Sequence, residues 1–279
     1  MKTVVLILIL AGLAYVAFRF LTGQKYRKSL FGTLKISENS SETPLKGNVF
    51  ANWWVVEHAV FLSFRSKKNE LNLYSAFLIK WILEGKITVI PDARSRKRVS
   101  MALKLDDFTD RTEMSLYEML LAAAGDDFIL EIKEFKRWAR RNYKLIDQYP
   151  RRADVRGKRY LIAKGYMDQD KKAIPDMYPK LCGVIEFKNY VKSLDLSLNQ
   201  PQSWQWKDYL VIGTLFGGGN KMLKQLKAQV PNSFRDYART IGMDAGHLLY
   251  CIEAAQLMAT KGFNAAKEEQ EREEQENQN

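Results

Sequence analysis

The chain of 279 residues is long enough for a membrane anchor followed by one large or two small folded domains. Hydrophobic residues make up 46% of it and aromatic residues 12%, which excludes an intrinsically disordered protein. The net charge of +12 favours acidic partners, namely anionic lipid headgroups, nucleic acid or an acidic protein surface. The cysteines Cys182 and Cys251 are isolated, which argues against a disulfide framework and a structural zinc site.

Residues 1–22 predict a single transmembrane anchor. A helix from Thr3 to Leu21 would be roughly 28 Å long, close to a hydrocarbon core of about 30 Å. The positive charges that follow it place the body in the cytoplasm and the N-terminus outside the inner (plasma) membrane. A cleaved signal peptide is the alternative, because residues 14–17 (AYVA) resemble a cleavage site. The flanking cations are Arg19, Lys25, Arg27 and Lys28.

The body is expected to be mostly α-helical with small β wings. Residues 23–49 predict a flexible linker, because the segment SENSSETP is polar and has no periodicity. Residues 50–108 then predict a winged-helix-like unit made of two helices and two strands. Asn69 is the expected N-cap of the second helix and Gly85 its stop. The expected helices are Asn52–Phe64 and Asn69–Trp81, and the expected strands are Ile87–Ile90 and Val99–Leu105.

Residues 109–175 predict a second winged-helix-like unit. It would contain a helix over Met114–Ala124 closed by Gly125, a long helix over Leu130–Ile146 and a third helix over Val155–Ala163. The third helix ends in YLIAKGYM, which parallels FLIKWILEGKITV in the first unit. Each has an apolar helix, a basic residue, a glycine and an apolar exit. We therefore interpret the two units as degenerate copies of one design.

Residues 176–264 predict a helical region, and residues 265–279 a disordered tail rich in Glu and Gln. The tail has no apolar periodicity, so it cannot offset the entropy cost of becoming ordered. Asp244 is the candidate N-cap of the last helix. The expected helices of the region are Lys180–Val191, Trp204–Phe216, Lys221–Gln229 and Asp244–Met258.

Between about Trp53 and Val230 the order of elements resembles a family of uncharacterised, predicted bacterial membrane proteins, the YciQ-like domain of unknown function. The matching stretches are FLIKWILEGKITV, YLIAKGYM, GVIEFKNYV and WKDYLVIGTLFGGGNKMLKQL. The resemblance implies the cytoplasmic half of such a protein and a membrane setting, but no activity. Members of the family usually carry a large extracytoplasmic domain and further spans that have no counterpart in this sequence.

Residues that could carry chemistry are few, so we expect no metal, no cofactor and no catalytic residue. The histidines His58 and His247 lack HxxxH or HExxH spacing, so both are expected to be structural. Cys251 follows His247 by four residues, on the same face of an expected helix. A thiolate–imidazole pair is one interpretation of this spacing, and a small side chain in the core is the favoured one. Residues 217–221 (GGGNK) lack the GxxxxGK[ST] pattern of a phosphate-binding loop and therefore predict a helix–helix connection. The backbone amides at the N-terminus of the next helix could still bind an anion.

The basic segment between Lys133 and Lys164 is the strongest functional indication. Arg137, Arg140, Arg141 and Lys144 follow i, i+3, i+4, i+7 spacing, which would place them on one helical face. Their mutual repulsion would be relieved by a nearby anion. The candidate binding residues, including the wing turn, are Arg94, Arg96, Lys97, Arg98, Lys133, Arg137, Arg140, Arg141, Lys144, Arg151 and Arg152.

Three explanations of this basic face compete: a solvated face that binds nothing, contact with anionic lipid, and nucleic-acid binding. A face that is nearly all Lys and Arg offers electrostatic attraction without base readout, which disfavours a sequence-specific DNA-binding protein. We therefore expect a non-catalytic, membrane-anchored interaction module that contacts protein partners or anionic lipid. The alternative is a membrane-tethered nucleic-acid-binding protein, and an enzyme comes third because no nucleophile–base pair is visible.

Overall fold

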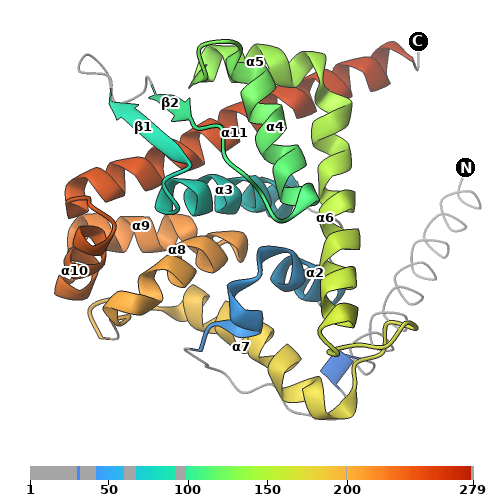
Figure 1. The fold of residues 1–279 in the computed structure, drawn as a ribbon, viewed down its shortest axis with the longest axis vertical. Coiled ribbons are helices and arrows are strands. Elements are labelled where there is room, and N and C mark those ends of the chain that lie inside the picture. The colour runs from blue at the N-terminus through green and yellow to red at the C-terminus, as the bar shows by residue number, and fades with distance from the viewer. Residues whose placement is uncertain (1–29, 32–41, 60–66, 92–98, 199, 278–279) are drawn as a thin grey trace, which may run out of the picture. The chain divides into compact units, whose positions relative to one another are not determined.

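A computed structural model gives the fold, which is mostly helical with a small antiparallel sheet, as expected from the sequence (Figure 1). No helix among the described residues is both long and apolar enough to cross a bilayer. The predicted anchor (residues 1–22) and its flanking Arg19, Lys25, Arg27 and Lys28 lie outside the described residues. The structure describes residues 30–31, 42–59, 67–91, 99–198 and 200–277.

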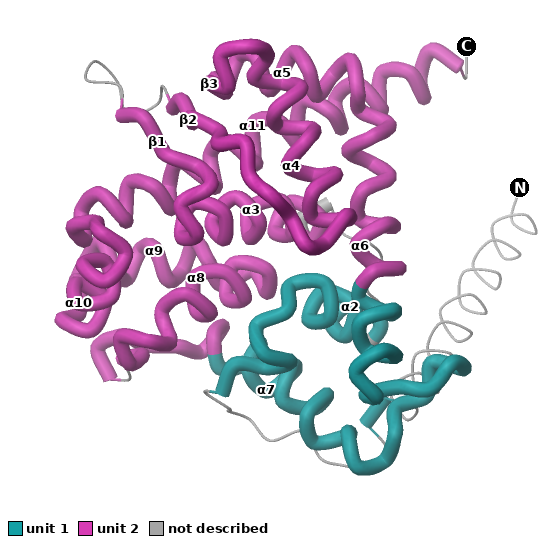
Figure 2. The backbone as a smooth tube through the Cα atoms, viewed as in Figure 1, with its two compact units in different colours: residues 1–66, 157–190 teal, residues 67–156, 191–279 magenta. Residues whose placement is uncertain are grey.

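The chain forms two compact units, and each is assembled from separate stretches of sequence (Figure 2). Unit 1 comprises residues 1–66 and 157–190, and unit 2 comprises residues 67–156 and 191–279. The predicted linear boundaries, after residues 108 and 175, do not coincide with these units.

Unit 1 is built around close helix packing. It contains helix α2 (Val49–Ala59), the last residues of α6 (Tyr143–Ala163) and most of α7 (Tyr178–Ser193), with the short 3₁₀ helix η2 (Pro175–Met177) before α7. A Cβ at Gly157 would lie 2.2 Å from the carbonyl oxygen of Phe50. Only glycine therefore lets α6 approach α2 this closely.

The predicted flexible linker is packed where the structure describes it. Residues 44–47 form the 3₁₀ helix η1 (Pro44–Gly47), and its Leu45 is only 5% exposed. The fully buried amide of Asn52 donates hydrogen bonds to the carbonyl oxygens of Pro44, at 3.1 Å, and Asn48, at 2.9 Å. These contacts join the end of the predicted linker to α2, which the polar composition of the segment does not reveal.

Unit 2 is organised around helix α3 (Lys67–Leu83), which packs against both α8 (Trp206–Leu215) and α11 (Ala245–Glu276). Leu73, Phe77 and Trp81 follow i, i+4, i+8 spacing on one face of α3, and all are 0% exposed, so this face packs into the core. Asn69 is not an N-cap, since α3 begins two residues earlier. The short helix η3 (Ser203–Gln205) precedes α8.

The sheet of unit 2 contains three antiparallel strands in the order β1-β2-β3. Strands β1 (Ile87–Pro91) and β2 (Val99–Leu103) form the predicted hairpin, with Ile87 opposite Leu103. Strand β3 (Ile129–Glu131) comes from the predicted second copy and pairs with β2. The two predicted copies therefore share one sheet.

The predicted long helix over Leu130–Ile146 is wrong. That stretch contains β3, then helix α5 (Ile132–Arg141), then a break at Asn142, whose φ of −119° and ψ of 28° are not helical, and the start of α6. Strand β3 exists because Ser100, Met101 and Ala102 of β2 offer a partner edge. That long-range pairing overrides local helix propensity.

The remaining helices of unit 2 are α4 (Arg111–Ala124), α9 (Gly219–Ala228) and α10 (Asn232–Thr240). Gly125 takes a φ of +78° and ends α4 as predicted, and Asp110 caps its start by accepting from two backbone amides. Helix α10 is absent from the sequence-based expectation.

The prediction of a disordered tail is wrong, because α11 continues to Glu276. Asp244 caps its start as predicted, accepting from the backbone amide of His247 at 2.9 Å. Ala265 and Ala266 are buried, and the ammonium of Lys267 lies 2.7 Å from Asp147 and 3.5 Å from Glu70. Burial and ion pairing thus stabilise a segment whose composition alone favours disorder.

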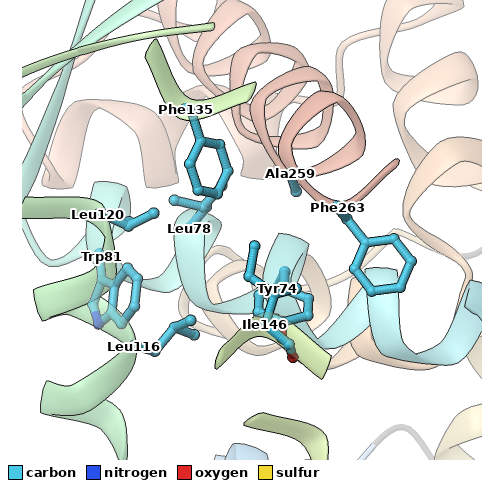
Figure 3. A pocket seen from close by; sticks show the side chains of 9 residues that line it. All are labelled: Tyr74, Leu78, Trp81, Leu116, Leu120, Phe135, Ile146, Ala259 and Phe263. Atoms are coloured by element: carbon cyan, nitrogen blue, oxygen red, sulfur yellow. The ribbon is translucent and has the colours of Figure 1, made fainter. Parts of the chain in front are cut away.

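Nine side chains from α3, α4, α5, α6 and α11 surround a small apolar cavity in the core of unit 2 (Figure 3). Its volume of about 20 Å³ is close to that of one water molecule. The hydroxyl of Tyr74 donates to the carbonyl oxygen of Ile146 at 2.5 Å, and burial raises the pKa of Tyr74 well above its ordinary value. The space is a packing void in the core and is too small for a ligand.

Candidate functional site

Helix α5 carries the predicted basic face and is held in place by α11. Its inward side is formed by Phe135 and Ala139, both buried. A Cβ at Gly262 of α11 would lie 2.1 Å from Cε1 of the Phe135 ring, so the two helices touch at this glycine. The outward side of α5 is therefore left to its charged residues.

The Glu-rich end of α11 neutralises part of this basic face. Arg140 lies 3.1 Å from Glu268, and Lys144 lies 3.7 Å from Glu273. Glu273 also accepts a hydrogen bond from the hydroxyl of Tyr143. The predicted disordered tail is in fact the acidic partner of the predicted anion-binding residues, which composition alone could not reveal.

Lys133 pairs locally with Glu131 of β3 at 3.0 Å. It is still 71% exposed, and a pair this open to solvent contributes at most about 1 kcal/mol to stability. Lys133 thus remains available to an external anion at little cost.

Four of the predicted residues are exposed arginines that make no ion pair within the described part of the chain: Arg137, Arg141, Arg151 and Arg152. We call them the unpaired arginines. Arg137 and Arg141 lie one turn apart on α5, and Arg151 and Arg152 lie in the third turn of α6. The break at Asn142 places Lys144 on a different helix from Arg137, so the four-residue face is not continuous.

The wing-turn residues Arg94, Arg96, Lys97 and Arg98 lie outside the described residues. The strands on either side of them, β1 and β2, are paired as predicted. A contribution from the wing turn thus stays a prediction.

The His247–Cys251 pair does not provide an activated nucleophile. The Sγ of Cys251 lies 3.6 Å from Nε2 of His247, so the two side chains meet as the spacing predicts. Burial, with a smaller contribution from the Asp244 carboxylate, raises the pKa of Cys251 to about 12. The sulfur is therefore a thiol at neutral pH, whereas a nucleophile requires the thiolate.

His58 stacks on Trp54 with ring centroids 4.3 Å apart, in keeping with the expected structural role. Among the described residues no three His, Cys, Asp or Glu side chains gather into a group that could hold a metal ion.

The unpaired arginines, together with the exposed Lys133, are thus the predicted residues within the described chain that keep their charge available to an anionic partner. Comparison with known proteins adds nothing to this picture, because no protein family, no curated protein and no solved structure matches the chain.

Proposed function

We propose that this protein is a non-catalytic binding module that contacts an anionic membrane surface through the unpaired arginines. The observation that carries the proposal is on α5. The Glu-rich end of α11 packs beside this helix and pairs with Arg140, yet Arg137 and Arg141 stay exposed and without an acidic partner in the described residues. Exposed cations that intramolecular carboxylates do not neutralise favour an external anion.

An anionic membrane is the preferred partner of the unpaired arginines, because the expected N-terminal anchor would hold the folded part of the chain beside a membrane. The N-terminal anchor, its orientation and the resemblance of residues 53–230 to YciQ-like membrane proteins belong to the same proposal. Each Lys or Arg near an anionic bilayer contributes about 1 kcal/mol of binding energy. The four unpaired arginines would then contribute about 4 kcal/mol, which is useful to a tethered domain and weak for a free one.

The test uses a chain that begins at Gly23 and therefore lacks the predicted anchor. It compares the binding of this chain to anionic and to neutral vesicles. We expect it to sediment with vesicles that contain phosphatidylglycerol and not with pure phosphatidylcholine vesicles. The double variant Arg137→Gln/Arg141→Gln should bind about 30-fold more weakly, since two cations are lost at about 1 kcal/mol each.

The matched control is Arg235→Gln/Arg239→Gln, which removes the same charge from exposed positions of α10. It should keep most of the vesicle binding if the unpaired arginines carry the contact. Equal losses in the two double variants would mean that only net charge matters, and the proposed face would then be wrong.

Nucleic-acid binding by a winged-helix-like unit is the second candidate. Helices followed by the β1–β2 hairpin, with a basic connection between the strands, favour it. The same Gly23 chain answers the question in a filter-binding assay. Retention of duplex DNA at low salt without binding to anionic vesicles would replace the membrane proposal with this one.

A further inference from the structure

A polar cleft lies in unit 2 where residues 216–218 join α8 to α9, and residues of α3 and α11 also line it. Its volume is about 350 Å³, at the lower end of the usual range for small-molecule sites. Gly217 and Gly218 lie in the predicted helix–helix connection, but Gly219 already begins α9, two residues before the predicted start at Lys221. The cleft beside it, however, is formed by polar side chains from four helices that no sequence spacing brings together.

The wall of the cleft contains polar groups without a partner. Thr214 is only 4% exposed, and its hydroxyl makes no hydrogen bond to any described residue. The side-chain amides of Asn72 and Gln256 also line the cleft and make none within the described chain. The Thr214 hydroxyl lines the cleft, where a bound polar ligand would supply the hydrogen-bond partner that the protein does not.

These groups converge on the first turn of α9. A Cβ at Gly219 would lie 2.7 Å from Oγ1 of Thr214 and 2.9 Å from Nε2 of Gln256. The two polar atoms therefore share one small region, and glycine at position 219 leaves that region open. Any larger residue would fill it.

The same region is electropositive. In the described structure the backbone amides of Gly219, Asn220 and Lys221 make no hydrogen bond, as expected for the first turn of a ten-residue helix. Lys221 and Lys224 line the cleft, and Lys224 has no ion pair among the described residues. No carboxylate is found among the described residues that line it, and the Lys221 ammonium also donates to the carbonyl oxygen of Lys192 at 2.8 Å, so Lys224 is the lining cation without a partner in the described chain.

We propose that this cleft binds a phosphomonoester of a small polyol or sugar. The phosphate would accept hydrogen bonds from the free amides of α9, from the hydroxyl of Thr214 and from the ammonium of Lys224. The amides of Asn72 and Gln256 suit the hydroxyl groups of the carbon chain. No aromatic side chain lies among the described lining residues to stack on a nucleobase, which disfavours a nucleotide.

The experiment is isothermal titration calorimetry of the full chain in nonionic detergent. The probes are inorganic phosphate, glycerol 3-phosphate and dihexanoyl phosphatidic acid, with glycerol as the uncharged control. We expect saturable binding of glycerol 3-phosphate, tighter than that of inorganic phosphate, and none of glycerol. Saturable binding of dihexanoyl phosphatidic acid alone would support the same site with a lipid headgroup as its source.

Three variants localise the binding. Lys224→Gln should weaken glycerol 3-phosphate binding at least about tenfold, and Thr214→Val about fivefold, because each removes one donor with little change of volume. Gly219→Ala should weaken it at least about tenfold by placing a methyl group where Thr214 and Gln256 converge. Far-ultraviolet circular dichroism and the thermal midpoint report whether each variant is folded.

The matched control is Lys227→Gln, which removes the same charge from the same helix at a position that pairs with Glu253 and does not line the cleft. Its affinity should equal that of the unmodified chain. The proposal is overturned if no phosphorylated probe binds with a Kd below about 1 mM. It is equally overturned if folded Lys224→Gln and Thr214→Val bind as well as the Lys227→Gln control.

Discussion

Replacing Gly262 with alanine tests the contact that holds α5 on α11. The new Cβ would lie 2.1, 2.3 and 2.7 Å from three atoms of the Phe135 ring, whereas carbon atoms normally pack at about 3.5–4.0 Å. The ring or the helix must therefore move by more than about 1 Å. Phe135 is only 6% exposed, and the core void that it lines has a volume of only about 20 Å³, so little free space can absorb that shift.

The expected change in the free energy of unfolding is the difference between a cost from overpacking and a gain from higher helix propensity. Overpacking of this severity costs about 3 kcal/mol, and exchanging glycine for alanine inside a helix returns about 1 kcal/mol. Gly262→Ala should thus lower the free energy of unfolding of unit 2 by about 2 kcal/mol. With a denaturant slope of about 2 kcal/mol per molar, the urea midpoint falls by about 1 M.

The control is Asn264→Ala, an exposed position two residues further along α11. It should leave the midpoint unchanged or raise it slightly, because alanine is the better helix former. Urea unfolding followed by circular dichroism measures both variants. If Gly262→Ala instead stabilises the protein by about 1 kcal/mol, helix propensity alone is operating and the close α5–α11 contact does not exist.

Two further predictions concern charge and pH. Lys267→Met should lower the free energy of unfolding by about 2–3 kcal/mol, because it removes the cation that pairs with both the nearly buried Glu70 and the half-buried Asp147. Arg272→Met at an exposed pair should cost less than about 0.5 kcal/mol in the same urea experiment, and equal losses would contradict the argument. Burial raises the pKa of Tyr117 to about 12 from the ordinary 10.0, so the neutral phenol stabilises the fold fully below pH 10, and this stabilisation is lost as the pH rises toward 12. Tyrosinate absorbance should accordingly show a late-titrating fraction that ionises together with the loss of helical circular dichroism, and its absence would refute the assignment.

Local signals in the sequence predict much of the fold. Asp244 caps a helix, Gly85 and Gly125 follow the ends of helices with positive φ, and alternating apolar residues mark both strands of the hairpin. Each of these rests on interactions within a few residues, which a single sequence reveals directly.

The errors have the opposite origin, because they occur where distant segments meet. Strand β3 is misread as helix because its partner β2 lies about thirty residues earlier, and pairing decides its conformation. The end of α11 is misread as disordered because Lys267 reaches Asp147, which is 120 residues away in the sequence. Composition describes the cost of ordering a segment but not the contacts that offset it.

The basic residues show the same contrast between local signals, which the sequence reveals, and long-range contacts, which it does not. Spacing predicts that Arg137 and Arg141 share a helical face, and the structure agrees. Spacing cannot predict that Glu268 neutralises Arg140, because 128 residues separate the two. The number of cations in the segment is therefore a poor measure of its capacity to bind an anion.

The intramolecular pairing has a consequence for how salt should act on the basic face. Salt screens the exposed pair of Arg140 with Glu268 and also weakens any attraction of the unpaired arginines to an anionic bilayer. Screening of the Arg140–Glu268 pair frees the Arg140 cation. Screening of the bilayer reduces the binding energy that each exposed cation contributes. Because the Debye length falls to about 10 Å at 0.1 M salt, the long-range membrane attraction is lost before the contact pair at 3.1 Å is disrupted. Raising the salt concentration should therefore weaken the proposed membrane contact steadily, while Glu268 of α11 keeps Arg140 paired within the protein.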